Sequence, residues 1–259
     1  MADDVRVNMS THNLRSAVFA VREAVAIEKS STEQLVDEYL TRIKVANNEM
    51  GKAVARADPH WPAHTLLTYV SSAILLSACT IESAVNEFFV DAVERSNWVQ
   101  ELGDRTLRHL AALWEEWLRE KQLGTLEKTQ IALTATGHRR FNKGRAPYQD
   151  ADDLFFLRNS LVHFVPEWLT NQDRHERIEK RLRSYGFRPN PFAAKDSPFF
   201  PGQCLGSDCA CWAVRTAHSF VLTFFKRMGI ESMSDVWQIM GYYLQDFENW
   251  EPIARREAA

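Results

Sequence analysis

One long apolar segment, residues 66–93, constrains the fold of this chain more than any other feature. It is apolar nearly all the way round a helical wheel, which is the pattern of a central helix covered by other elements. Polar side chains interrupt it repeatedly, among them Glu82, Asn86 and Asp91. A bilayer would leave these groups without partners, so a membrane span is not expected. We predict a buried helix over about residues 63–96.

The remainder of the chain also repeats apolar residues at helical spacing, and no segment keeps the alternation of a strand for long. Only 10 Gly and 9 Pro interrupt 259 residues, which favours long regular elements. Shorter helices are expected near residues 107–118, 128–135, 150–164, 171–185, 208–228 and 236–247. The predicted fold class is therefore all-α. Because no repeat or low-complexity linker divides the chain, we expect a single helical domain over residues 1–259.

Two further helices are predicted at the N-terminus, within about residues 11–48, and are expected to form an antiparallel hairpin. Thr11 stands where the N-cap of the first helix would lie. The second opens at Ser31 with Gln34 three residues on, which is the spacing of a capping box.

Net charge, cysteine spacing and the first residues of the chain narrow the classes of function that we expect. The net charge is −3, so nucleic-acid binding would need a local basic patch. The cysteines are Cys79, Cys204, Cys209 and Cys211. Their spacing matches no common zinc motif and no His partner lies near them, so we expect neither a metal nor a cofactor. The acidic start of the chain lacks the order of a signal peptide, and we expect a reduced, cytoplasmic protein with no membrane contact.

An arginine interrupts the apolar face of the helix expected near residues 150–164. On a helical wheel that face comprises Leu154, Phe155, Leu157, Leu161, Val162 and Phe164. Arg158 projects into its middle, whereas Asn159 and His163 lie four residues apart on the opposite side. A guanidinium stays charged, so burying it requires compensation by a carboxylate, a helix break or an interface.

The carboxylate that best fits this need is Glu82, which is itself out of place in an apolar helix and has Asn86 one turn on. We predict that Glu82 pairs with Arg158 and fixes its orientation. The alternative is a surface arginine whose stem lies over the core while its charge stays in water.

The sequence around Arg158 resembles a known protein family. The run Leu157–His163 reads LRNSLVH and matches the R-x4–6-H signature of HEPN domains, including the polar residue directly after the arginine. Glu82 and Asn86 are similar to the Glu-x3-Asn helix common in that family. Further similarities are Pro147–Asp150, Pro166–Trp168 and the helix around residues 213–225. The resemblance spans about residues 63–228.

The resemblance implies a HEPN-like helical bundle over residues 63–228, to which the N-terminal hairpin and the C-terminal helices are added. HEPN domains commonly dimerise with their two motifs facing each other. Many are metal-independent endoribonucleases that act as toxins or as effectors in antiviral defence and stress responses. Others are catalytically inactive and serve as dimerisation modules or as RNA- or protein-binding modules. Both classes of function remain open here, and an antitoxin or other regulatory partner would be expected for an active toxin.

The motif residues suit RNA cleavage by the 2′-hydroxyl. His163 would act as base or acid, and Arg158 would stabilise the charge on the phosphorane. Asn159 would donate a further hydrogen bond or orient His163, with Glu82 and Asn86 in support. Acid and base are two tasks for one histidine, so we expect a homodimer with a composite site. The products would carry 2′,3′-cyclic phosphate and 5′-hydroxyl ends.

A basic loop over residues 137–147 precedes the motif helix. Its RNA-binding candidates are Arg139, Arg140, Lys143 and Arg145, with His138 beside them. The loop could guide phosphates toward Arg158, or it could be an ordinary solvated loop.

Overall fold

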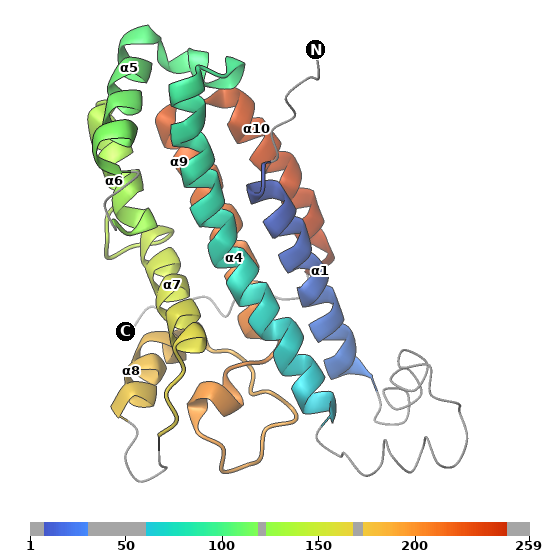
Figure 1. Cartoon of the computed structure of the whole chain (residues 1–259). Coiled ribbons are helices and arrows are strands. Elements are labelled where there is room, and N and C mark those ends of the chain that lie inside the picture. The colour runs from blue at the N-terminus through green and yellow to red at the C-terminus, as the bar shows by residue number, and fades with distance from the viewer. Residues whose placement is uncertain (1–7, 31–60, 119–122, 168–172, 248–259) are drawn as a thin grey trace, which may run out of the picture. The chain divides into compact units, whose positions relative to one another are not determined.

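The computed structural model describes residues 8–30, 61–118, 123–167 and 173–247, and within these ranges every regular element is a helix (Figure 1). The all-α prediction is therefore confirmed. The chain divides into two compact units, which are described separately. Of the described residues, the first comprises 8–18, 74–118, 123–164 and 213–247, and the second 19–30, 61–73, 165–167 and 173–212. The single domain over residues 1–259 stays a prediction.

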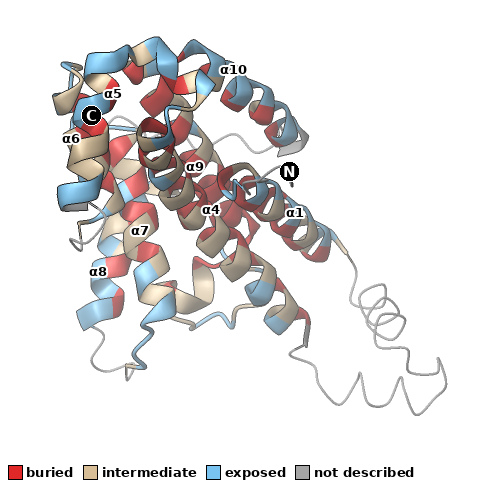
Figure 2. Cartoon of the chain, turned by 45° about the horizontal axis from the view of Figure 1, so that its top comes forward, coloured by how far each residue is buried: buried red, intermediate tan, exposed pale blue. Residues whose placement is uncertain are grey.

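The first unit is built around the larger part of α4 and of α9, and Figure 2 shows buried residues concentrated on both helices. Its elements are the start of α1 (Ser10–Lys29), α4 (Trp61–Glu94), η1 (Asn97–Leu102), α5 (Asp104–Leu113), η2 (Trp114–Leu118), α6 (Thr125–Ala135), α7 (Tyr148–Val162), α9 (Ser207–Met228), α10 (Glu231–Met240) and η5 (Gly241–Phe247). Phe88 lies at the centre of an aromatic cluster, with its ring 5.3 Å from Phe224 and 5.2 Å from Phe89. All three side chains are fully buried.

Helix α4 is long because its apolar residues leave almost no polar face. Ile74, Ile81 and Phe88 are fully buried at successive seven-residue steps. By length and hydropathy alone, residues 62–94 could cross a membrane, yet 56% of their apolar window is buried inside this structure. Such burial is what the sequence predicts for a central helix, whose apolar surface is covered by other elements.

The second unit contains α8 (Asp173–Leu182), η3 (Arg183–Tyr185) and η4 (Phe199–Gln203), together with the remaining turns of α1, α4 and α9. The clustered cysteines Cys204, Cys209 and Cys211 are buried here as thiols that form no disulfide. Burial raises the pKa of the Cys204 thiol to about 12, and it raises that of Cys209 well above the ordinary value. These thiols stay protonated and pack as small apolar side chains.

Four helices begin at a glutamate carboxylate from outside the helix, which is 77, 179 and 130 residues away for α1, α9 and α10 but only 8 residues away for α8. Glu87 accepts hydrogen bonds from the Ser10 backbone N–H at 2.9 Å and from its hydroxyl at the start of α1. The same arrangement joins Glu167 to α8, Glu28 to α9 and Glu101 to α10. The first turn of a helix leaves backbone N–H groups without partners and carries partial positive charge, so a carboxylate there is stabilising.

The prediction that Thr11 caps α1 is wrong, because the helix already begins at Ser10 and its first turn is held by Glu87. The second helix of the predicted hairpin, which opens at Ser31, lies outside the described residues. The last predicted helix, over residues 236–247, begins earlier than expected, as α10 starts at Glu231.

Replacing Glu101 with glutamine is expected to destabilise the protein only where the carboxyl is ionised. Hydrogen bonds from the Ser232 hydroxyl and the Glu231 N–H lower the pKa of Glu101 below its ordinary 4.5. Because the folded-state pKa is depressed, the stabilisation is present above the unfolded pKa and is lost as pH falls through the folded one. Urea unfolding should show a loss of about 0.3–1 kcal/mol at pH 7 for Glu101→Gln. That loss should vanish in acid, and a difference that persists at every pH would contradict this account.

Candidate functional site

Helix α7 carries the sequence motif and buries one side against the first unit. Leu154 and Leu157 are fully buried, as the wheel predicts. The helix ends at Val162, two residues before the expected end. Pro166 explains this boundary, because it has no N–H to donate to the Val162 carbonyl and its ring would clash there. Val162 and Phe164, which the wheel places on the apolar face, are 54% and 45% exposed, so that face is not covered at the end of α7.

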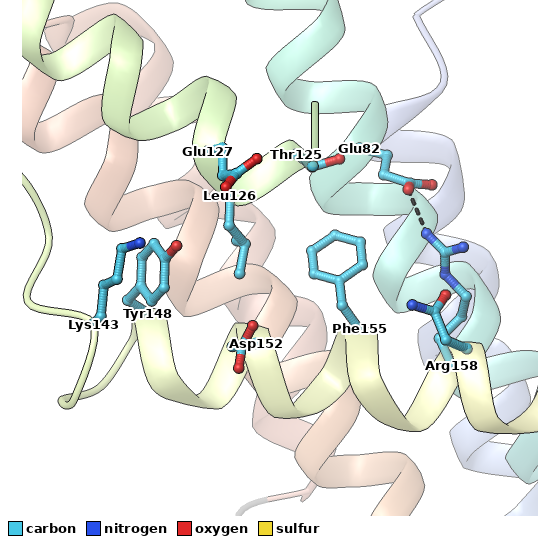
Figure 3. Close-up of a pocket in the computed structure, with 11 residues that line it drawn as sticks. Glu82, Thr125, Leu126, Glu127, Lys143, Tyr148, Asp152, Phe155 and Arg158 are labelled. Carbon is cyan, nitrogen blue, oxygen red and sulfur yellow. Dashed lines mark hydrogen bonds and ion pairs between the residues drawn. The ribbon is translucent and has the colours of Figure 1, made fainter. Parts of the chain in front are cut away.

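The predicted pairing of Glu82 with Arg158 is confirmed. Arg158 Nη2 donates to Glu82 Oε1 across α7 and α4, as the dashed line in Figure 3 marks. The arginine side chain is only 23% exposed and its guanidinium lies 5.4 Å from the centre of the Phe155 ring. Glu82 remains 36% exposed, so water screens the pair, and we expect it to contribute at most about 1 kcal/mol to stability. Its main consequence is geometric, since it holds a cation in one direction.

This ion pair lies at the edge of a cavity of about 470 Å³ (Figure 3). Its lining comes from α4, from the turn before α6, from α6 itself, from the basic loop and from α7: Glu82, Gly124, Thr125, Leu126, Glu127, Lys143, Tyr148, Asp152, Phe155, Arg158 and Asn159. We call it the Arg158 cavity. Both signs of charge are present in it, so it can contact a phosphate and hydrogen-bond donors of the same ligand.

Burial and two carboxylates keep the phenol of this cavity neutral. Burial raises the pKa of Tyr148, and Asp152 and Glu127 raise it further. The pKa of Cys79 is also raised, by burial first and then by Glu82, while Arg158 acts in the opposite direction. Tyr148 can therefore serve as a hydroxyl donor, and Cys79 stays a thiol and is a poor nucleophile.

His163 lies outside the Arg158 cavity. It follows the last residue of α7 with φ −110° and ψ 43°, and its backbone N–H still donates to the Asn159 carbonyl at 2.9 Å. The side chain is exposed, and it makes no hydrogen bond or ion pair with Arg158 among the described residues. Within one chain, the structure thus brings Arg158 and Asn159 to the cavity and leaves His163 at the adjacent helix end.

Asn86, which was predicted to support the site, bonds to a lysine of α6. Asn86 is exposed, and its Oδ1 accepts a hydrogen bond from Lys128 Nζ at 3.2 Å. Burial lowers the pKa of Lys128, while Glu82 opposes that shift, so this lysine lies within electrostatic reach of the site. Nothing in the sequence indicates that Lys128 lies near the site, because it belongs to no motif and has no unusual neighbours in the chain. Phe155 carried a usable signal, because it stands three residues before Arg158 on one helix.

The basic residues predicted to bind RNA line two different cavities. Lys143 lines the Arg158 cavity, whereas the arginines of the loop line a second cavity of about 780 Å³. That second cavity is bounded by His138, Arg139, Arg140, Phe141, Asn142, Arg145, Ala146 and Arg227. Arg227 comes from α9 and was not predicted. No group of three or more His, Cys, Asp or Glu in the described ranges could hold a metal ion.

Comparison with protein family models, with characterised proteins and with solved structures finds no match to this chain. The HEPN resemblance therefore rests on the motif residues and on their helical context.

Proposed function

We propose that this chain is a HEPN-type, metal-independent endoribonuclease that acts in the cytoplasm as a homodimer, as a toxin or defence effector. The observation that carries the proposal is the Arg158–Glu82 pair, which holds a guanidinium at the edge of an open cavity beside Asn159. A positive charge held in this way suits the dianionic transition state of phosphodiester cleavage, because it needs little reorganisation during the reaction.

In the proposed reaction the 2′-hydroxyl of RNA attacks the adjacent phosphorus while a base removes its proton. The P–O5′ bond breaks, and an acid gives a proton to the departing 5′-oxygen. The products are a 2′,3′-cyclic phosphate and a 5′-hydroxyl. His163 supplies base or acid, since each ring nitrogen of an imidazole can accept or donate a proton. Arg158 binds the non-bridging phosphate oxygens, with Asn159 as a further donor.

The position of His163 favours a site shared between two subunits. One imidazole cannot be base and acid in the same step, and this one lies outside its own chain's Arg158 cavity. A second copy would bring a second histidine to the RNA. Val162 and Phe164, which flank His163, are large, apolar and exposed, as are side chains that an interface covers.

The same geometry also favours a second candidate, a catalytically inactive dimerisation module or RNA- or protein-binding module. In such a protein the Arg158–Glu82 pair would serve structure alone. The separation of His163 from Arg158 would then not matter, because no reaction would need the two side chains together. The two candidates differ in whether His163 is needed for RNA cleavage.

Cleavage of an end-labelled, mixed-sequence RNA by the purified protein in EDTA separates these candidates. We expect cleavage that leaves cyclic phosphate ends, and we expect His163→Ala to reduce it about 100- to 10,000-fold, the usual contribution of general acid–base catalysis. The matched control is His109→Ala, an exposed histidine on α5, which should cleave as the wild type does. Absence of cleavage by folded, dimeric protein would favour the inactive module. Equal cleavage by all three proteins would point to a contaminant.

A further inference from the structure

The second cavity differs from the Arg158 cavity in carrying charge of one sign. Four arginines line it, namely Arg139, Arg140, Arg145 and Arg227, and His138 joins them, whereas no carboxylate does. We call it the arginine cavity. It lies wholly within the first unit, and its volume of about 780 Å³ falls in the range of ligand sites.

These guanidiniums have no counter-ion in the part of the chain that the structure describes. Arg140 Nε donates to the Thr134 hydroxyl at 2.6 Å, and Arg227 Nη1 donates to the carbonyls of Arg139 and Arg140 at 3.1 and 3.0 Å. The side chains of Arg139 and Arg145 make no hydrogen bond or ion pair with the described residues. Like charges gathered around one hollow repel each other, and an anionic ligand would relieve that repulsion.

The loop that presents these charges is held in place. Gln130 Nε2 donates to the Phe141 carbonyl at 3.0 Å, and the Phe141 N–H donates back to Gln130 Oε1 at 2.9 Å, both buried. The Phe141 ring stacks on the Phe220 ring with their centres 5.1 Å apart, and the guanidinium carbon of Arg227 lies 4.4 Å from the centre of the Phe141 ring. A loop anchored in this way loses little conformational entropy when a ligand binds, so its arginines are prepared for binding.

The lining indicates which anion fits. A guanidinium matches two oxygens of a phosphate, so several arginines suit a ligand with several phosphates. The lining contains no Tyr or Trp, and its one Phe, Phe141, is only 4% exposed and offers no face on which a nucleobase could stack. Recognition would therefore act on phosphates without reading bases, which is how proteins hold a nucleic-acid backbone.

The basic loop also connects this cavity to the candidate catalytic residues. Lys143 stands between the loop's arginines in sequence, yet it lines the Arg158 cavity (Figure 3). A ligand that is short, such as pyrophosphate, would occupy one cavity, whereas a strand with many phosphates could contact both.

We propose that the arginine cavity binds the phosphodiester backbone of single-stranded RNA, and that Lys143 receives the neighbouring phosphates on the way to Arg158. This inference rests on the proposed function, for which it names the way in which the substrate is held. Arg227 is then a positioning residue, because it fixes the backbone of Arg139 and Arg140.

The test is the binding of a fluorescent 2′-O-methyl oligoribonucleotide, which has no free 2′-hydroxyl and cannot be cleaved by this route. Fluorescence anisotropy would compare the wild type with Arg139→Gln/Arg145→Gln, whose side chains are exposed and make no contacts that folding needs. We expect the double variant to bind at least about 10-fold more weakly, as charge-assisted hydrogen bonds are lost. The slope of log Kd against log salt should fall by about 1.4, or 0.7 for each lost phosphate contact.

The matched control is Arg105→Gln/Arg108→Gln, which removes the same charge from exposed positions on α5, outside both cavities. It should bind within about twofold of the wild type, because substitutions of exposed residues away from a binding site have little effect. Circular dichroism melts would check that both variants fold. Equal weakening by both double variants would overturn the proposal, since it would show an effect of net charge alone.

Three further outcomes separate this proposal from others. If pyrophosphate raises the Tm in an Arg139-dependent manner while the oligonucleotide does not bind, the cavity serves a small phosphorylated ligand and the proposal fails. If the oligonucleotide binds through these arginines although His163→Ala does not change cleavage, the cavity proposal stands and the ribonuclease fails. Cleavage that needs His163 but not Arg139 and Arg145, with unchanged binding, would give the opposite result.

Discussion

Replacing Arg158 with alanine is expected to lower the rate of RNA cleavage about 100- to 1,000-fold, the usual effect of removing one donor that stabilises an oxyanionic transition state. Arg158 is held toward Glu82 at the edge of its cavity, so its charge is already oriented when RNA binds. Arg158→Lys should recover only a small part of the rate, because a lysine cannot contact two phosphate oxygens in one plane. The measurement is the single-turnover rate on an end-labelled RNA in EDTA.

Glu82→Gln is the informative companion of Arg158→Ala. The amide oxygen still accepts a hydrogen bond from Arg158 but carries no charge, so the direction of the guanidinium is largely kept. We expect a much smaller loss of cleavage than in Arg158→Ala. Both variants should unfold within about 1 kcal/mol of the wild type, because the pair is partly exposed. Equal loss of cleavage in both, with a large loss of stability, would mean that the pair serves structure alone and would favour the inactive module.

Replacing Phe88 with alanine is expected to lower the free energy of unfolding by about 3–5 kcal/mol, as for other large-to-small changes in a core. Phe88 is fully buried, and its ring lies against those of Phe89, Trp98, Phe224 and Phe225. The helices around it are anchored at other points, so the cavity left by the missing ring would collapse only in part. Urea unfolding followed by circular dichroism measures the change.

The matched control for this substitution is Phe19→Ala. The same side chain is 58% exposed on α1, so its loss should change the free energy of unfolding by less than about 0.5 kcal/mol. If the two substitutions cost the same, the aromatic cluster around Phe88 is not the core of the first unit.

Several elements could be predicted from the sequence because their causes are local. The predicted helices near residues 63–96, 150–164 and 208–228 agree with α4, α7 and α9 to within two residues at each end. Apolar side chains at helical spacing determine such helices, and Pro166 and the positive φ of Gly229 (71°) explain two of the ends.

The Glu82–Arg158 pair could also be predicted, although its members are 76 residues apart. Each is a charge within an apolar helical face, and each required a partner of opposite sign. Asn86 lies one turn after Glu82 on α4, and because an amide does not require an opposite charge, the sequence could not predict its bond to Lys128. His163 was placed correctly on the polar side of the helix, but its distance from the Arg158 cavity follows from where α7 ends.

The sequence by itself determined the all-α class, the long central helix, the motif helix and the charge pair, because each follows from periodicity or from the cost of burying a charge. Tertiary structure alone decided which carboxylates hold the helix starts, and it placed Arg227 in the arginine cavity and Lys143 in the other one. Arg227 and the loop carbonyls it binds are 87 and 88 residues apart. Such polar contacts arise only when packed helices bring distant side chains within about 3 Å, a distance that no local pattern encodes.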